Sequence, residues 1–212
     1  MVARAAWPHV RVMRHTTSCL ISMVLLAPAV PAEQRTIINL YDLAGLPLPI
    51  REEMKRETSK IFLQAGASLE WVDCEIAGKP LNLAECAQPL GAARLMLELI
   101  PGTNKKNPRA SGKAIIQRGS SVYACLYPDR VRVLARDAGW EFGDLLGHAA
   151  AHELGHLLLE SAEHSPAGVM RARWETQDLW RLPHDGLVFL PGQLAAVKVN
   201  RPTQRAERRM AP

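Results

Sequence analysis

The chain has 212 residues, of which 48% are apolar and 22% are charged. These proportions are typical of a folded globular protein and exclude a disordered or fibrous chain. The net charge of +5 would suit a nucleic-acid-binding protein, but the excess lies at the two ends. Residues 1–32 contain three arginines and no acid, and residues 200–212 contain four arginines and one glutamate, which leaves −1 for the segment between them. A phosphate-binding surface needs basic side chains gathered on the folded domain, so the distribution predicts no nucleic-acid partner.

The first 32 residues have the features of a secretory signal peptide. Arg11 and Arg14 supply the positive start, and Cys19–Val30 supplies a short apolar core. Val30 and Ala32 place small residues where a cleavage site requires them. A membrane-spanning helix needs about 20 apolar residues, so we expect cleavage after Ala32 and no stable membrane insertion afterwards. The predicted location is secreted or periplasmic.

The remaining chain is predicted to form one domain over residues 33–199, followed by a basic, disordered tail over residues 200–212. β-Branched and aromatic residues predict a first strand at Arg35–Leu43. A helix is expected over Pro49–Ala65 because apolar residues recur at helical spacing. Gly66 is suited to end it, and Ser68–Asp73 is predicted to be the second strand.

The middle of the chain is predicted to be mostly strand and loop. Cys74–Gly91 is expected to be a loop, and the alternating leucines of Arg94–Ile100 predict a third strand. Two shorter strands are expected at Lys113–Gln117 and Ser121–Tyr127, and we expect the second of them to be the edge strand beside the active site. Helices are predicted further along at Asp129–Ala138, Gly143–Leu159 and Pro191–Val199.

Three cysteines remain after the predicted cleavage, namely Cys74, Cys86 and Cys125. Export favours an oxidising compartment, in which a Cys74–Cys86 bridge would close a short loop. Cys125 would then be a buried thiol, although the spacing alone leaves other pairings open. None of the three has the CxxC spacing of a cysteine zinc site.

A cluster of histidines marks the most informative part of the chain. Four of the five histidines after residue 32 lie between positions 148 and 164, and five consecutive residues within this region form the motif His152-Glu153-Leu154-Gly155-His156. Spacing of four places both imidazoles on one face of the predicted helix, where both can reach one ion. Glu153 is then close enough to act as general base on a metal-activated water. The motif predicts one catalytic Zn²⁺ ion and a metallopeptidase.

Zinc in a catalytic site takes three protein ligands and keeps one position open, so a third ligand is required. His164 is the best candidate, eight residues after His156. Glu160 is the main alternative, because it would lie on the same face as His156 if the helix continued.

The segment His152–Met170, HELGHLLLESAEHSPAGVM, resembles the active-site stretch of the metzincin metallopeptidases, HExxHxxGxxH followed by a methionine-containing turn. His164 and Ser165 are similar to the third histidine and following serine of the matrixin branch, and Met170 lies where the methionine turn belongs. The resemblance implies that Met170 lies beneath the metal without binding it. It covers about residues 148–174, and it departs from the family where the glycine and third histidine would fall, at Leu159 and Ala162.

The fold implied by this resemblance is α+β and zincin-like. A twisted mixed β-sheet would pack against the first helix and the active-site helix, with a small C-terminal helical subdomain. The function implied is a secreted endopeptidase that acts on a protein or peptide substrate. The alternative is a secreted module that binds zinc without catalysis.

The roles predicted for several other side chains near the motif are less specific. His148 lies one turn before His152 and is expected to be packed behind the ligands in preference to leaning over the cleft. Trp174 is expected to be a core or wall residue, and Asp178 is expected to be solvated.

Overall fold

The computed structural model of the protein describes residues 35–193, except 82, 92, 118–121, 175 and 182–186. The predicted signal peptide and basic tail lie outside the described residues. So does most of the helix predicted at Pro191–Val199, of which residues 191–193 are described and are helical. No helix among the described residues is both long and apolar enough to cross a membrane.

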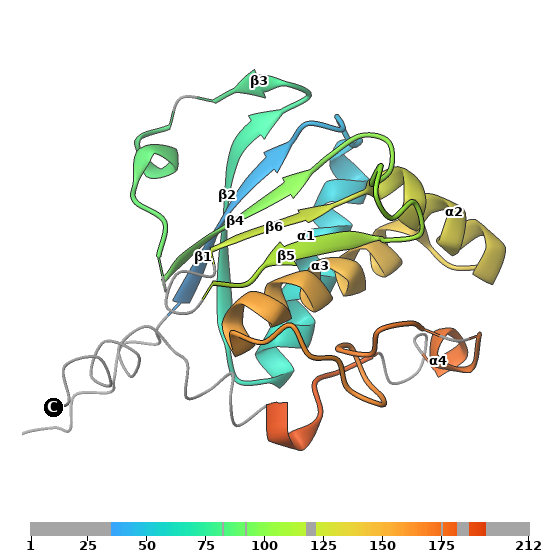
Figure 1. Cartoon of the computed structure of the whole chain (residues 1–212). Coiled ribbons are helices and arrows are strands. Elements are labelled where there is room, and N and C mark those ends of the chain that lie inside the picture. Colours follow the sequence, from blue (N-terminus) through green and yellow to red (C-terminus); the bar gives the residue numbers. More distant parts are fainter. Residues whose placement is uncertain are drawn as a thin grey trace, which may run out of the picture. The chain divides into compact units, whose positions relative to one another are not determined.

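A six-stranded mixed sheet forms the centre of the fold (Figure 1). Its strands follow the spatial order β3-β2-β1-β4-β6-β5. β1 is parallel to both of its neighbours, and β4 is parallel to β6, whereas the strands at the two ends of the order are antiparallel to theirs. The bounds are β1 Arg35–Asp42, β2 Ser68–Ile76, β3 Lys79–Pro80, β4 Arg94–Leu99, β5 Gly112–Ile115 and β6 Tyr123–Leu126.

Three helices have bounds close to those that the sequence predicts, namely α1 Leu48–Gln64, α2 Pro128–Ala138 and α3 Phe142–Leu159. The 3₁₀ turn η1 Ala84–Ala87 and the short helix α4 Thr176–Arg181 lie outside the predicted helices. Gly66 follows the end of α1 with a φ of 74°, and Gly139 caps α2 with a φ of 70°. Both glycines adopt the left-handed conformation that commonly ends a helix.

One apolar core lies between the sheet, α1 and α3. Leu95, Leu97 and Leu99 of β4 alternate toward it, as their spacing predicts, and all three are buried. Phe62 of α1 and Leu154 of α3 belong to the same cluster. The apolar core therefore holds α3, which carries the HExxH motif, in a fixed position against the sheet.

Two buried polar groups brace the turn between β1 and α1. The Asp42 carboxylate accepts a hydrogen bond from the Leu46 N–H at 2.8 Å and lies 3.4 Å from the Arg51 guanidinium. Both side chains are almost completely buried. A buried charge is tolerated only when it is paired and hydrogen-bonded, and this pairing fixes the start of α1 relative to β1.

The segment predicted to be a loop at Cys74–Gly91 contains regular structure. β2 continues to Ile76, the short strand β3 pairs back on it, and η1 follows. A disulfide joins Cys74 of β2 to Cys86 of η1, which confirms the pairing that short-loop closure favours, and Cys125 is a buried free thiol. The prediction was wrong here because the bridge and the antiparallel pairing order a segment that has little hydrophobic periodicity.

The prediction for the edge of the sheet was also wrong. β6, within the predicted strand Ser121–Tyr127, lies between β4 and β5 and is not an edge strand. Its residues Ala124, Cys125 and Leu126 are buried, as expected of a strand with a neighbour on each side. The edge is β5, which alternates between half-buried and exposed residues. The short helix α4 was not predicted at all.

Candidate metal centre

The helix α3 presents the first two histidines of the motif to the same point. His152 and His156 are one turn apart, their ring centroids are 4.7 Å apart, and their Nε2 atoms are 3.1 Å apart. His152 is half-buried and His156 is buried. Most other residues of α3 are buried too, so the helix has no freedom to rotate these rings away from each other without disturbing the core.

Backbone carbonyl groups fix which nitrogen of each ring carries the proton. The Nδ1–H of His152 donates to the carbonyl oxygen of Val169, and the Nδ1–H of His156 donates to that of Ser161, both at 2.7 Å. A carbonyl oxygen can only accept, so each neutral ring carries its proton on Nδ1 and presents a lone pair at Nε2. The rings stay neutral because burial lowers the pKa of both, to about 4 for His152.

Two lone pairs that face each other at 3.1 Å repel unless a cation lies near both. Tetrahedral zinc with Zn–N bonds of about 2.0–2.1 Å places two ligand nitrogens about 3.3 Å apart. The donor set and its spacing therefore fit a divalent metal ion of the zinc type.

The third imidazole comes from the loop after α3. His164 stacks on His152 with 5.3 Å between ring centroids, and it meets His156 edge to face at 4.9 Å. One ligand nitrogen from each of the three histidines lies within 4.8 Å of the others. Among the described residues this is the one group of three or more such side chains that could hold a metal ion.

Glu160, the alternative third ligand, does not belong to this group. α3 ends at Leu159, and Glu160 adopts left-handed backbone angles, with φ 50° and ψ 36°. The chain therefore leaves the helix before Glu160 can lie one turn above His156. This bend directly after Leu159 lets the loop bring His164 back to the other two rings.

Glu153 lies beside the histidines in a strongly buried position. Burial raises the pKa of its carboxyl group to about 8, and a hydrogen bond from the Ala114 N–H of β5 opposes this rise. A divalent cation nearby would favour the carboxylate form. The side chain thus has the burial and the position of a proton acceptor next to the candidate metal site.

The edge strand approaches Glu153 at Gly112, a residue that sequence reasoning missed. A Cβ atom at position 112 would lie 2.6 Å from Cγ of Glu153 and 2.8 Å from the carbonyl oxygen of Cys125. Glycine is required here because any side chain would displace the carboxylate or the strand. The only sequence signal was a glycine immediately before the predicted strand Lys113–Gln117.

Met170 packs against α3 at Gly155, a position between His152 and His156 along the helix. Its side chain is fully buried, and a Cβ atom at position 155 would lie 2.5 Å from its sulfur. Gly155 of the motif is therefore the residue that admits Met170. Gly168 has a φ of 75°, and its neighbour Val169 donates its N–H to the carbonyl oxygen of Val188 at 3.0 Å.

His148 is buried away from the three ligand nitrogens. Its Nδ1–H donates to the Asp144 carbonyl oxygen at 2.9 Å, and its Nε2 accepts from the Leu187 N–H at 3.4 Å. Trp174 lies against both His148 and His152, with ring centroids 6.4 Å and 6.2 Å away. His148 therefore packs behind the site, and Trp174 forms part of its wall.

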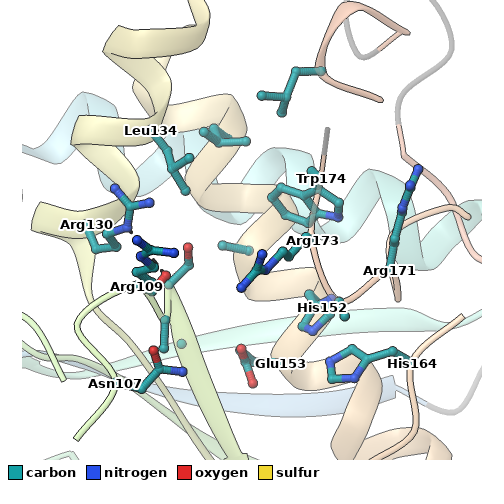
Figure 2. A pocket seen from close by; sticks show the side chains of 17 residues that line it. Asn107, Arg109, Arg130, Leu134, His152, Glu153, His164, Arg171, Arg173 and Trp174 are labelled. Atoms are coloured by element: carbon teal, nitrogen blue, oxygen red, sulfur yellow. Dashed lines mark hydrogen bonds between the residues drawn. The ribbon is translucent and has the colours of Figure 1, made fainter. Parts of the chain in front are cut away.

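A cavity of about 610 Å³ opens beside His152, Glu153 and His164. Figure 2 shows these three side chains at its base, with Trp174 on the wall. Asp178, expected to be solvated, is instead buried, and its carboxylate accepts hydrogen bonds from the Arg171 guanidinium at 2.8 Å and 2.9 Å. Its position in the unpredicted helix α4 explains the error.

No protein-family model matches the chain, and a search of curated proteins finds no relative.

Proposed function

We propose that this protein is a secreted, zinc-dependent endopeptidase with a metzincin-like active site. The observation that carries the proposal is the set of three imidazoles, two of them with Nε2 directed to one point by backbone hydrogen bonds, beside the buried carboxylate of Glu153. His152, His156 and His164 would hold one Zn²⁺ ion. The mixed sheet, the placement of α3 and the buried Met170 agree with that resemblance.

Zinc in such a site supplies Lewis acidity, which polarises the scissile carbonyl and activates a water molecule as nucleophile. Glu153 would accept the proton of that water and deliver it to the leaving amine. The Ala114 N–H holds the carboxylate in place for this role. The rings of His152 and His156 are already neutral and oriented by the backbone, so neither ring would have to lose a proton when the metal binds.

The edge strand β5 is suited to hold an extended substrate. Among the described strands only β6 pairs with it, so the other side of β5 can add one more strand. Gly112 and Ala114 of β5 both lie against Glu153. A peptide that pairs with β5 would therefore bring its backbone close to the proposed base.

Export is part of the proposal and is supported by the disulfide. The Cys74–Cys86 bridge suits an oxidising compartment outside the cytosol. The signal peptide predicted from residues 1–32 would direct the protein there.

The test combines metal content with cleavage. The purified protein should hold about one zinc ion per chain, measured by elemental mass spectrometry, and should cleave casein or a peptide library. Glu153→Gln should keep the zinc and abolish cleavage, because an amide cannot accept the proton. Glu163→Gln is the matched control, since Glu163 is exposed and lies outside the cavity lining.

Zinc retention without cleavage by the wild-type protein would refute the peptidase and leave a zinc-binding module. Loss of zinc in Glu153→Gln would contradict the role of Glu153 as base, because a general base is not a ligand.

A further inference from the structure

The cavity beside the metal site has an unusual balance of charge. Four arginines line it, and among the described residues Glu153 is the only acidic side chain in its lining. The segment between the predicted signal peptide and the tail has a net charge of −1. The positive charge is thus concentrated at the cavity and is not a general property of the domain.

Three of the four arginines have no acidic partner among the described residues. Arg171 is held by Asp178, but neither an ion pair nor a carboxylate hydrogen bond is formed by Arg109, Arg130 or Arg173. The Arg130 guanidinium donates instead to the carbonyl oxygen of Arg109 at 3.4 Å. Three like charges kept together without counter-charges favour an anion that binds among them.

These arginines come from three different parts of the fold. Arg109 precedes β5, Arg130 lies in the first turn of α2, and Arg173 follows Met170. Figure 2 shows Arg109 and Arg130 side by side on one wall, while Arg173 extends from the opposite side toward the space above Glu153. A ligand in the cavity would therefore meet guanidinium groups from two sides.

Another part of the lining of the same cavity is apolar. Leu134, Leu145, Ala149 and Leu179 contribute to it, together with Trp174. An apolar lining accommodates the methylene groups of a side chain, while the arginines bind a charged group at its end. Guanidinium matches the geometry of a carboxylate with two parallel hydrogen bonds.

We propose that the cavity selects substrates with an acidic side chain, aspartate or glutamate, close to the scissile bond. This inference rests on the proposed peptidase function, since it names the substrate class of the same site. A polynucleotide fits this cavity less well, because the domain outside the cavity is not basic. A peptide's C-terminal carboxylate has the same chemistry as the side chain, and the experiment must separate the two.

The experiment uses blocked pentapeptides, Ac-Ala-Ala-Xaa-Ala-Ala-NH₂, with glutamate, glutamine or lysine as Xaa. Cleavage by the wild-type protein is followed by mass spectrometry, and binding to zinc-loaded Glu153→Gln is measured by calorimetry. The glutamate peptide should exceed the glutamine peptide by about tenfold to a hundredfold in kcat/KM and in affinity, as expected for charge-assisted hydrogen bonds. The lysine peptide should be the poorest of the three.

Substitutions of the arginines test whether these side chains cause the preference for the glutamate peptide. Arg173→Ala and Arg130→Ala should each lower the ratio of glutamate to glutamine cleavage, and Arg130→Lys should restore part of it. Arg136→Ala is the matched control on the same helix as Arg130, since Arg136 is 75% exposed, pairs with Asp137 and lies outside the cavity lining. Its ratio should equal that of the wild-type protein.

The outcomes distinguish the two proposals. Cleavage with equal rates for glutamate and glutamine peptides would overturn this inference and leave the peptidase intact. Absence of all cleavage would refute the peptidase, and the calorimetry would still decide whether the cavity prefers the acidic peptide. A glutamine peptide with a free C-terminal acid that binds as well as the blocked glutamate peptide would assign the cavity to chain ends and overturn the side-chain proposal.

Discussion

Gly112→Ala offers a test of how the edge strand positions the proposed base. The new Cβ atom would lie 2.6 Å and 2.7 Å from Cγ and Oε1 of Glu153, and 2.8 Å from the carbonyl oxygen of Cys125. Contacts this short cannot be kept, so either the carboxylate moves or β5 shifts from β6. Overpacking of this kind costs about 1–3 kcal/mol of stability.

The effect on catalysis should be larger than the effect on stability. A general base raises the rate of the chemical step by about 10²–10⁴-fold. Displacing Glu153 from the Ala114 N–H should remove a large part of this rate enhancement. We expect kcat to fall by at least about tenfold, with Glu153→Gln as the lower limit of activity. Zinc content should not change, because no ligand histidine is among the nearest atoms to position 112.

The assay measures kcat, KM, zinc content and thermal unfolding of Gly112→Ala beside Gly91→Ala. Position 91 is the control because a Cβ atom there meets nothing within 4 Å. If Gly112→Ala keeps wild-type kcat and unfolds like Gly91→Ala, the close approach of β5 to Glu153 does not position the base and the reasoning fails.

Three other predictions concern the metal and the disulfide. In a direct zinc titration, His164→Ala should have a much lower zinc affinity than the wild type, and Glu160→Ala should have an affinity close to that of the wild type. The reverse order would assign the third ligand to Glu160. Zinc at 100 times its dissociation constant should stabilise the fold by about 2.7 kcal/mol. For a domain of this size this corresponds to a rise in Tm of roughly 5–10 °C. A chelator that leaves Tm unchanged would show that the folded state does not bind zinc. Replacing both Cys74 and Cys86 with serine should lower the free energy of unfolding, measured with denaturant, by about 3 kcal/mol, because the bridge closes a loop with a sequence separation of 12 residues. Unchanged stability would show that the loop is ordered without the bridge.

Local sequence patterns predict most of the helices and strands because each has its own periodicity and end signals. The alternating leucines of β4 and the glycines that follow α1 and α2 are of this kind. The motif in α3 is likewise local, since a spacing of four is enough to bring His152 and His156 together. Its third partner was harder to assign, because the path from His156 to His164 depends on where the helix ends.

The features that the sequence did not reveal depend on contacts between distant segments. Arg109, Arg130 and Arg173 are far apart along the chain, and no pattern indicates that they meet at one cavity. The edge of the sheet was misassigned because strand order depends on pairing across the whole domain. Gly112 could not be distinguished from the other glycines, because its importance depends on the side chain of Glu153 that lies against it.

The loop after α3 has a second role beyond carrying His164. The two carbonyl groups that hold the Nδ1 protons of His152 and His156 belong to Val169 and Ser161, which lie at either side of His164 along this loop. Site assembly is therefore cooperative: a displaced loop would lose the third imidazole and the tautomer of the other two together. Since main-chain carbonyls make these contacts, substitutions of the side chains at 161 and 169 should leave both tautomers unchanged, so long as both carbonyls stay beside the same rings.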